Sequence, residues 1–375
     1  MFLIEEWRAK LSNRSKLTTK PRYQFLTLIR NSEYPIICLF CCLQIYLHMK
    51  MVFWGPGQLF AIFLVLIVVL VSLWIYFRQS IFRCDSKADL KGKTVIVTGA
   101  NCGIGFYTAL DFAKRNARVI LACRDKIKAE KARQEIISLS QNSNVLVGLV
   151  DLCYMKSVKD FADKINSEES RLDVLVNNAG VVSTGKPKEI TDEGFETIFA
   201  GNYFGPFLLT NLLLDLMKKS APSRIINVSS VVNKFGTIDF DNLNAEKSFQ
   251  FQKRYFDSKL AQILFTRELA RRLEGTGVTA NVLHPGSVAS KLLRNLFILL
   301  RIPIEFFIKL FCKTAEEGAQ TSIYLAVSEE VTDISGKYFV DSDIKESETN
   351  PLSRDKDIAK QLWDISESLT GLKDK

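Results

Sequence analysis

The sequence predicts an α/β fold, in which a single doubly wound parallel-sheet domain follows an N-terminal transmembrane helix. Two observations carry this prediction. From Lys93 onward, short runs rich in β-branched residues alternate with helical patterns, an order that builds a parallel sheet with helices on both faces. Before that point, the run LFAIFLVLIVVLVSLWIYF, which ends at Phe77, carries no charge. Its length suits a hydrocarbon core of about 30 Å.

The positive charge lies mainly in the N-terminal part of the chain. The formal net charge is +9, and residues 1–93 contribute +8 of it. A nearly neutral remainder lacks the basic face that would displace counterions from phosphates, so no nucleic-acid partner is expected. The chain has two histidines, and its one CxxC pair, Cys38 and Cys41, lies in an apolar run. No metal site is therefore expected.

These patterns divide the chain into four segments. Residues 1–50 form a basic extension and residues 58–77 the transmembrane helix, whose Trp74 and Tyr76 suit a membrane interface. Residues 90–345 form the folded domain, and residues 346–375 a C-terminal tail with a helix. A buried core helix is the competing interpretation of 58–77.

The alternating pattern places the elements of the domain in order. Strands are expected at 94–99, 118–122, 145–151, 172–177, 223–229 and 277–283, with helices at 105–114 and 126–139. The first strand runs into the turn TGANCGIG. There Gly99 can turn the chain, Gly103 can let the backbone approach a pyrophosphate, and Gly105 can bring a helix close to the sheet. Phe106 follows where an ATPase loop needs lysine, which excludes that class.

The spacing G-x-x-x-G-x-G resembles the classical short-chain dehydrogenase/reductase family, and further motifs follow in that family's order. They are Asp151-Leu152, Asn177-Asn178-Ala179-Gly180, Asn202, Ser229-Ser230, Tyr255-x-x-x-Lys259 and Pro285-Gly286-Ser287-Val288-Ala289-Ser290. The resemblance implies a Rossmann fold and oxidoreductase chemistry with a nicotinamide dinucleotide. It implies a catalytic set of Asn202, Ser230, Tyr255 and Lys259.

Tyr255 and Lys259 are four residues apart and so share one helix face. An ammonium next to a phenol favours phenolate and lowers a pKa that is otherwise about 10, which would make Tyr255 an acid or base near neutral pH. A surface pair is the alternative interpretation of this spacing. Ser230 would polarise a substrate carbonyl, with Ser229 as the competing candidate. By resemblance, Asn202 anchors a water that relays protons through Lys259.

The end of the second strand predicts the choice of cofactor. NAD enzymes of this fold place an acid there, whereas this chain has Cys123 followed by Arg124. A guanidinium can clamp a 2′-phosphate through paired hydrogen bonds, which predicts NADP(H). Asp125 would oppose the phosphate if it turned inward, but we expect it to start the next helix. The expected cofactor residues are Gly99, Asn101, Gly103, Ile104, Gly105, Arg124, Asp151, Leu152, Asn178, Ala179, Gly180, Tyr255, Lys259, Pro285, Gly286, Val288 and Ser290.

Within the family, TGANCGIG, ILACRD and SKLAQILFTRELARRL resemble the membrane-anchored retinol dehydrogenase branch. That branch implies interconversion of a lipophilic alcohol with its aldehyde or ketone. Retinol and retinal are the leading substrate pair. A hydroxysteroid or a fatty aldehyde is the alternative substrate, and a non-catalytic binding or scaffolding module is the alternative of another class.

The apolar segment 291–312, which has basic residues interspersed, is expected to be a substrate lid that contacts membrane lipid. An ordinary core or dimer helix pair is the other interpretation, and a homodimer stays open. The expected location is the endoplasmic reticulum membrane, single-pass, with a cytosolic domain. The basic head, if native, permits a mitochondrial membrane instead.

Overall fold

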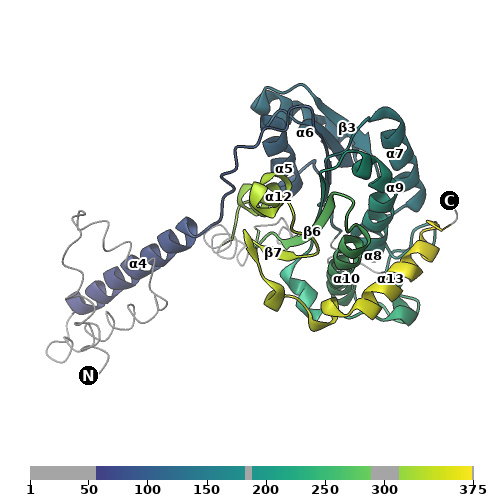
Figure 1. Ribbon diagram of the computed structural model, residues 1–375. Helices are drawn as coiled ribbons and strands as arrows, with labels where there is room; N and C mark the ends of the chain where they lie inside the picture. Colours follow the sequence, from purple (N-terminus) through teal and green to yellow (C-terminus); the bar gives the residue numbers. More distant parts are fainter. Residues whose placement is uncertain (1–55, 182–187, 289–311, 374–375) are drawn as a thin grey trace. The chain divides into compact units, whose positions relative to one another are not determined.

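The computed structural model describes residues 56–181, 188–288 and 312–373 (Figure 1). Contacts divide the chain into two units, Met1–Ser72 and Leu73–Lys375. The predicted extension 1–50 and nearly all of the predicted lid 291–312 lie outside the described residues. The second unit holds every described residue of the predicted site.

Helix α4 (Pro56–Gln79) covers the predicted membrane segment 58–77 and extends two residues beyond it at each end. Large apolar side chains lie exposed along it, with Phe60 63% and Val68 62% exposed. Among the described residues, Thr197–Lys219 is long and apolar enough to cross a membrane, but 83% of its apolar window is buried in the domain. It is a core helix. Membrane insertion of α4, which holds the shorter apolar run Phe60–Tyr76, stays a prediction.

The second unit is built on an eight-stranded sheet with the order β3-β2-β1-β4-β5-β6-β7-β8. The strands are β1 (Thr94–Thr98), β2 (Arg118–Cys123), β3 (Val145–Leu149), β4 (Val174–Asn177), β5 (Ser223–Val228), β6 (Val278–His284), β7 (Tyr338–Val340) and β8 (Asp343–Ile344). All neighbours pair in parallel except β7 and β8. The strand order reverses between β1 and β4, and ligands bind such sheets at the carboxyl ends of the strands beside this reversal.

Helices cover both faces of this sheet (Figure 1). On one face lie α5 (Gly103–Lys114), α6 (Lys126–Ser140) and α12 (Ala315–Val327), and on the other lie α7 (Met155–Glu168), α9 (Gly205–Lys219), α10 (Phe251–Arg272) and α13 (Lys356–Leu369). The predicted α/β class with a parallel sheet is confirmed.

Alternation along the strands fills two separate cores. In β1, Val95 and Val97 pack on the α5 side while Ile96 packs on the α9 side, because successive side chains of a strand point to opposite faces. Since both faces are covered, the central strands are apolar almost without interruption. This explains why short continuous runs, rather than alternating ones, located the strands in the sequence.

The structure also contains elements that the sequence patterns did not predict. The two short strands β7 and β8 extend the sheet, and a π-helix, η1 (Ala200–Phe204), joins α8 (Thr197–Phe199) to α9. Single π turns often occur at functional positions. The 3-10 helices η2 (Val231–Phe235) and η3 (Phe240–Asn242) follow β5, and η5 (Glu329–Val331), η6 (Glu346–Glu348) and η7 (Pro351–Arg354) lie near the C-terminus.

A buried ion pair ties the start of α10 to the start of α8. Arg254 Nε donates to Glu196 at 3.2 Å, and the two side chains are 4% and 0% exposed. Glu196 also accepts from the backbone N–H groups of Ile198 and Phe199 at 2.8 and 3.0 Å. The guanidinium donates to the main-chain oxygens of Asn242 and Leu243 as well. This pair fixes α10 against the segment that leads into η1.

We expect Arg254→Met to lower the free energy of unfolding by about 3–5 kcal/mol, because it leaves the Glu196 carboxylate buried without its cation. Chemical denaturation measures the loss. Lys156→Met serves as the control, since the Lys156–Asp160 pair is 79% and 63% exposed, and such pairs contribute at most about 1 kcal/mol. Similar small losses in both variants would contradict the role given to Arg254.

Candidate active site

The predicted site residues come together at the carboxyl ends of the central strands. A β-carbon added to Gly99, after β1, would lie 3.0 Å from the Cα atom of Ala179, which follows β4. A β-carbon added to Gly180 would lie 3.7 Å from Asn202 Oδ1 and 3.8 Å from Lys259 Nζ. The glycine turn, the Asn178-Ala179-Gly180 motif and α10 therefore meet at one place.

Tyr255 and Lys259 share one face of α10, with Lys259 Nζ 5.6 Å from the centre of the Tyr255 ring. Ser230 is the N-cap of η2, two residues after the end of β5, and its side chain interacts with Tyr255. The neighbouring Ser229 is 3% exposed and donates its hydroxyl to the main-chain oxygen of Lys259 at 2.8 Å. Ser230, which is half-buried, is the serine that meets the phenol.

The electrostatics of the pair differ from the expectation. Burial raises the pKa of Tyr255, and the hydrogen bond with Ser230 acts in the opposite direction. Burial also lowers the pKa of Lys259 to about 7. We expected the lysine to lower the phenol pKa, but desolvation of the phenol is the larger effect here, and the ammonium itself loses charge on burial.

Lys259 has two fixed acceptors. Its Nζ donates to the main-chain oxygen of Val228 in β5 at 2.9 Å and to Gln262 Oε1 at 3.2 Å. Sequence reasoning did not single out Gln262. The available signal was its spacing, because Tyr255, Lys259 and Gln262 stand at positions i, i+4 and i+7 of one helix, and Gln262 interrupts the apolar run LAQILF.

Asn202 lies in η1 and is 0% exposed. Its side chain accepts from the N–H of Val181 at 2.6 Å and donates to the Val181 oxygen and to Ser258 Oγ, both at 3.0 Å. Its main-chain oxygen accepts from Gln262 Nε2 at 2.7 Å. The asparagine therefore joins the segment after β4 to α10.

The glycine turn is held to the motif after β4 by Thr98. Its hydroxyl accepts from the N–H groups of Asn178 and Ala179, both at 3.0 Å, and Asn178 Nδ2 donates to the Thr98 oxygen at 2.8 Å. Gly103 has a φ of +61°, and the space beside its Cα is open to 4 Å. A phosphate could approach the backbone there, next to the start of α5.

Strand β2 ends at Cys123 and Arg124 follows it, and phosphate binding by Arg124 stays a prediction. Cys123 is 3% exposed and accepts hydrogen bonds from the backbone of Ala100 and Asn101. Arg124 is exposed, and its guanidinium has no hydrogen bond or ion pair with the described residues. Asp125 caps α6, where it accepts from the Lys128 N–H at 3.0 Å and pairs with Lys128 Nζ at 2.6 Å. As expected, it starts the helix.

Other predicted cofactor residues follow the ends of β3 and β6. Asp151 Oδ1 accepts from the Cys153 N–H at 3.0 Å, and Leu152 is buried. After β6, the Pro285-Gly286 turn leads to Val288. A β-carbon added to Gly318 of α12 would lie 2.6 Å from Val288 Cγ2 and 3.3 Å from Ile104 Cγ1, so both side chains approach this glycine. Ser290 lies outside the described residues.

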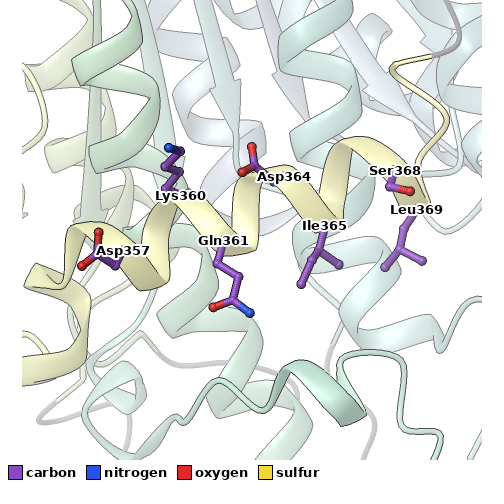
Figure 2. A pocket seen from close by; sticks show the side chains of 7 residues that line it. All are labelled: Asp357, Lys360, Gln361, Asp364, Ile365, Ser368 and Leu369. Atoms are coloured by element: carbon purple, nitrogen blue, oxygen red, sulfur yellow. The ribbon is translucent and has the colours of Figure 1, made fainter.

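A surface hollow of about 470 Å³ lies elsewhere, along α13 (Figure 2). One helix supplies all its lining residues, which are Asp357, Lys360, Gln361, Asp364, Ile365, Ser368 and Leu369. Figure 2 shows these side chains spread along a single helix rather than converging from several elements. None of them is a predicted site residue, so this hollow is not the candidate site.

Comparison with known proteins agrees with the geometry. The profile of the short chain dehydrogenase family matches residues 93–298. Human retinol dehydrogenase 14 is 47% identical over 323 residues, which cover 80% of this chain and 95% of that protein. Human retinol dehydrogenase 13 is 48% identical over 294 residues, covering 77% and 88% respectively. A Pseudomonas aeruginosa structure described as an RhlG/NADP active-site complex matches with a TM-score of 0.55 and 25% identity, over 67% of this chain and 95% of that one.

The burial of Lys259 predicts a stability that depends on pH. Since its pKa falls from 10.5 to about 7 on folding, the unfolded chain binds one more proton than the folded chain between these pH values. Burying the charged lysine therefore destabilises the folded chain fully below about pH 7, and this effect is lost above pH 10.5. Relative to Lys259→Met, the unchanged chain should therefore gain roughly 1 kcal/mol per pH unit across this range.

Urea denaturation of both proteins at about pH 7 and about pH 9 measures this gain. Lys219→Met, at an exposed position at the end of α9, is the matched control. A difference between Lys259→Met and the unchanged chain that is the same at both pH values would contradict the burial of the charge.

Proposed function

We propose that this chain, which belongs to the short-chain dehydrogenase family, is an NADP(H)-dependent oxidoreductase. It interconverts a lipophilic alcohol and its aldehyde or ketone, and retinol with retinal is the leading substrate pair. The observation that carries the proposal is the convergence of Ser230, Tyr255, Lys259 and Asn202 beside Gly180. Relatives named retinol dehydrogenases, at 47–48% identity, support the substrate.

We assign the acid and base work to Tyr255. In reduction its phenol would donate a proton to the oxygen of the carbonyl, and in oxidation it would take the proton back. Ser230 would donate a hydrogen bond to the same oxygen and polarise it. In its protonated form, Lys259 would place a positive charge beside the phenol. The dinucleotide supplies or accepts the hydride when it is bound.

The residues at the cofactor side fit a dinucleotide with a 2′-phosphate. The open backbone at Gly103, together with the start of α5, suits a pyrophosphate. Arg124 is exposed and unpaired among the described residues, while Asp125 is engaged with Lys128. A guanidinium would therefore meet the 2′-phosphate without a competing carboxylate. The similar structure with NADP supports this choice.

A membrane location supports a lipophilic substrate. Exposed apolar side chains along α4 suit a hydrocarbon environment, and we propose a single-pass anchor in the endoplasmic reticulum membrane with a cytosolic domain. The segment 291–312 would be a substrate lid in contact with lipid, and the extension 1–50 would precede the anchor. The catalytic domain would span 90–345, and the tail 346–375 would end with α13.

The central test is a panel of carbonyl compounds. Purified full-length protein in detergent would be supplied with NADPH and either retinal, a steroid ketone or a long-chain alkanal, and consumption of NADPH would be measured. We expect the highest kcat/KM with retinal. A higher kcat/KM with the steroid ketone or the alkanal would make that compound, rather than retinal, the substrate. No turnover of any of the three would favour a binding module.

Tyr255→Phe should lower kcat by about 100-fold or more, which is typical for the loss of a general acid. NADPH binding and the thermal midpoint of unfolding should change little, because only the hydroxyl is removed. Tyr324→Phe, at a tyrosine that bonds Glu330 away from the site, is the matched control. Near-normal turnover by the Tyr255→Phe variant would contradict the assignment of Tyr255 as the general acid.

Arg124→Ala should weaken NADPH binding by about 10- to 150-fold, because a hydrogen bond to a charged group contributes roughly 1.5–3 kcal/mol. The affinity for NADH should change little. Fluorescence titration with both cofactors measures this. Adding Cys123→Asp to this variant should make it bind NADH more tightly than NADPH, since the new carboxylate can accept hydrogen bonds from the ribose hydroxyls. Equal losses for NADPH and NADH would mean that Arg124 is structural.

A chain that begins at Arg78 should be extractable from membranes without detergent. It lacks the apolar part of α4 but keeps the two hydrogen bonds from Arg78 to Glu317, at 3.0 and 2.7 Å. Fractionation after a carbonate wash is the measurement. If this chain stays in the membrane, then another segment is the anchor.

A further inference from the structure

Gln262 connects the two groups that a proton relay at this site would use. Its Oε1 accepts from Lys259 Nζ at 3.2 Å, and its Nε2 donates to the main-chain oxygen of Asn202 at 2.7 Å. The glutamine is 2% exposed. Both ends of one buried carboxamide are therefore satisfied, one by α10 itself and one by the π-helix η1.

We propose that Gln262 is a positioning residue of the active site, whose carboxamide forms the direct link between the Lys259 ammonium and the Asn202 oxygen. This proposal rests on the proposed function, because it concerns the same proton transfer. By resemblance, Asn202 was expected to reach Lys259 through an anchored water. The Gln262 carboxamide bonds to both of these residues, to the Lys259 ammonium and to the Asn202 main-chain oxygen.

The link limits the freedom of the ammonium. A lysine ammonium has three N–H donors, and the Val228 oxygen and Gln262 Oε1 take two of them. One donor is left for the groups beside Tyr255. Free rotation about the last bond of Lys259 would break one of the two bonds, so the orientation of the third donor is fixed.

The link also limits where a proton can go. A carboxamide neither gains nor loses a proton near neutral pH, so Gln262 can orient Lys259 but cannot carry its proton. It occupies one of the two lone pairs of the Asn202 oxygen, an atom of η1. Lys259 Nζ lies near Tyr255, which is titratable, and near the neutral groups of Val228, Gln262 and Gly180.

Two substitutions separate a polar link from simple packing. Gln262→Met keeps the length of the side chain but removes the hydrogen bonds that the carboxamide makes with the Asn202 oxygen and with one Lys259 N–H. Gln262→Ala removes the carboxamide and opens a polar space in which a water can bridge the same two atoms. A residue that only fills volume would tolerate methionine better than alanine. The proposal requires the opposite order.

We expect Gln262→Met to lower kcat about 10- to 100-fold, and Gln262→Ala to lower it less than about 5-fold. The KM for NADPH should stay unchanged in both. Gln320→Met is the matched control, since Gln320 is a half-buried glutamine of α12 that bonds the Cys84 N–H and the Glu316 oxygen. It should leave kcat unchanged. An alanine variant that is as slow as or slower than the methionine variant would overturn the proposal.

A second measurement needs no substrate. NMR titration of lysine side chains in the full-length protein, with Lys259→Met to assign the signal, reports the pKa of Lys259. Gln262→Met should lower this pKa, because the charged form loses a hydrogen bond, and Gln262→Glu should raise it, because a carboxylate favours the ammonium. An unchanged pKa in both variants would overturn the proposal. If the unchanged protein turns over no carbonyl compound, the proposed function fails, and this titration still tests Gln262.

Discussion

The constraint on which the rest of the site depends is the burial of the polar face of α10. Lys259 and Gln262 are 4% and 2% exposed, and a buried polar group without a partner costs about 1–3 kcal/mol. Their partners must therefore come from the protein. The Val228 oxygen at the end of β5 and the Asn202 oxygen in η1 supply them. These bonds fix how α10 is rotated, and with it where Tyr255 stands.

A second attachment holds the start of the same helix. Arg254 directly precedes Tyr255 and is paired with Glu196, whose carboxylate caps α8. The helix that carries Tyr255 is thus joined at two places to the segment that carries Asn202. One of these places, Asn202, lies in the π-helix η1. In this wider turn, the Asn202 oxygen accepts from Gln262 of α10.

The sheet supplies the frame for the opposite side of the site. Because β1 and β4 are parallel neighbours at the reversal of strand order, the turn after β1 and the motif after β4 must meet at one edge. Thr98 binds the backbone after β4. Arg124 follows the next strand, β2, at the same edge. The glycine turn and Tyr255 are thus brought together from positions more than 150 residues apart in the sequence.

The sequence by itself determined the parallel α/β fold, the places of the glycine turn and of Tyr255 and Lys259, and the helix-capping role of Asp125, because each depends on local pattern and spacing. It did not reveal Gln262 as a partner of Asn202, the Arg254–Glu196 pair or the π-helix. It also misjudged the pKa of Tyr255. Those features depend on which groups are buried together, and burial is a property of the packed chain. Hydrogen bonds across 60 residues, such as that from Gln262 to Asn202, exist only once the sheet has brought both helices to one edge.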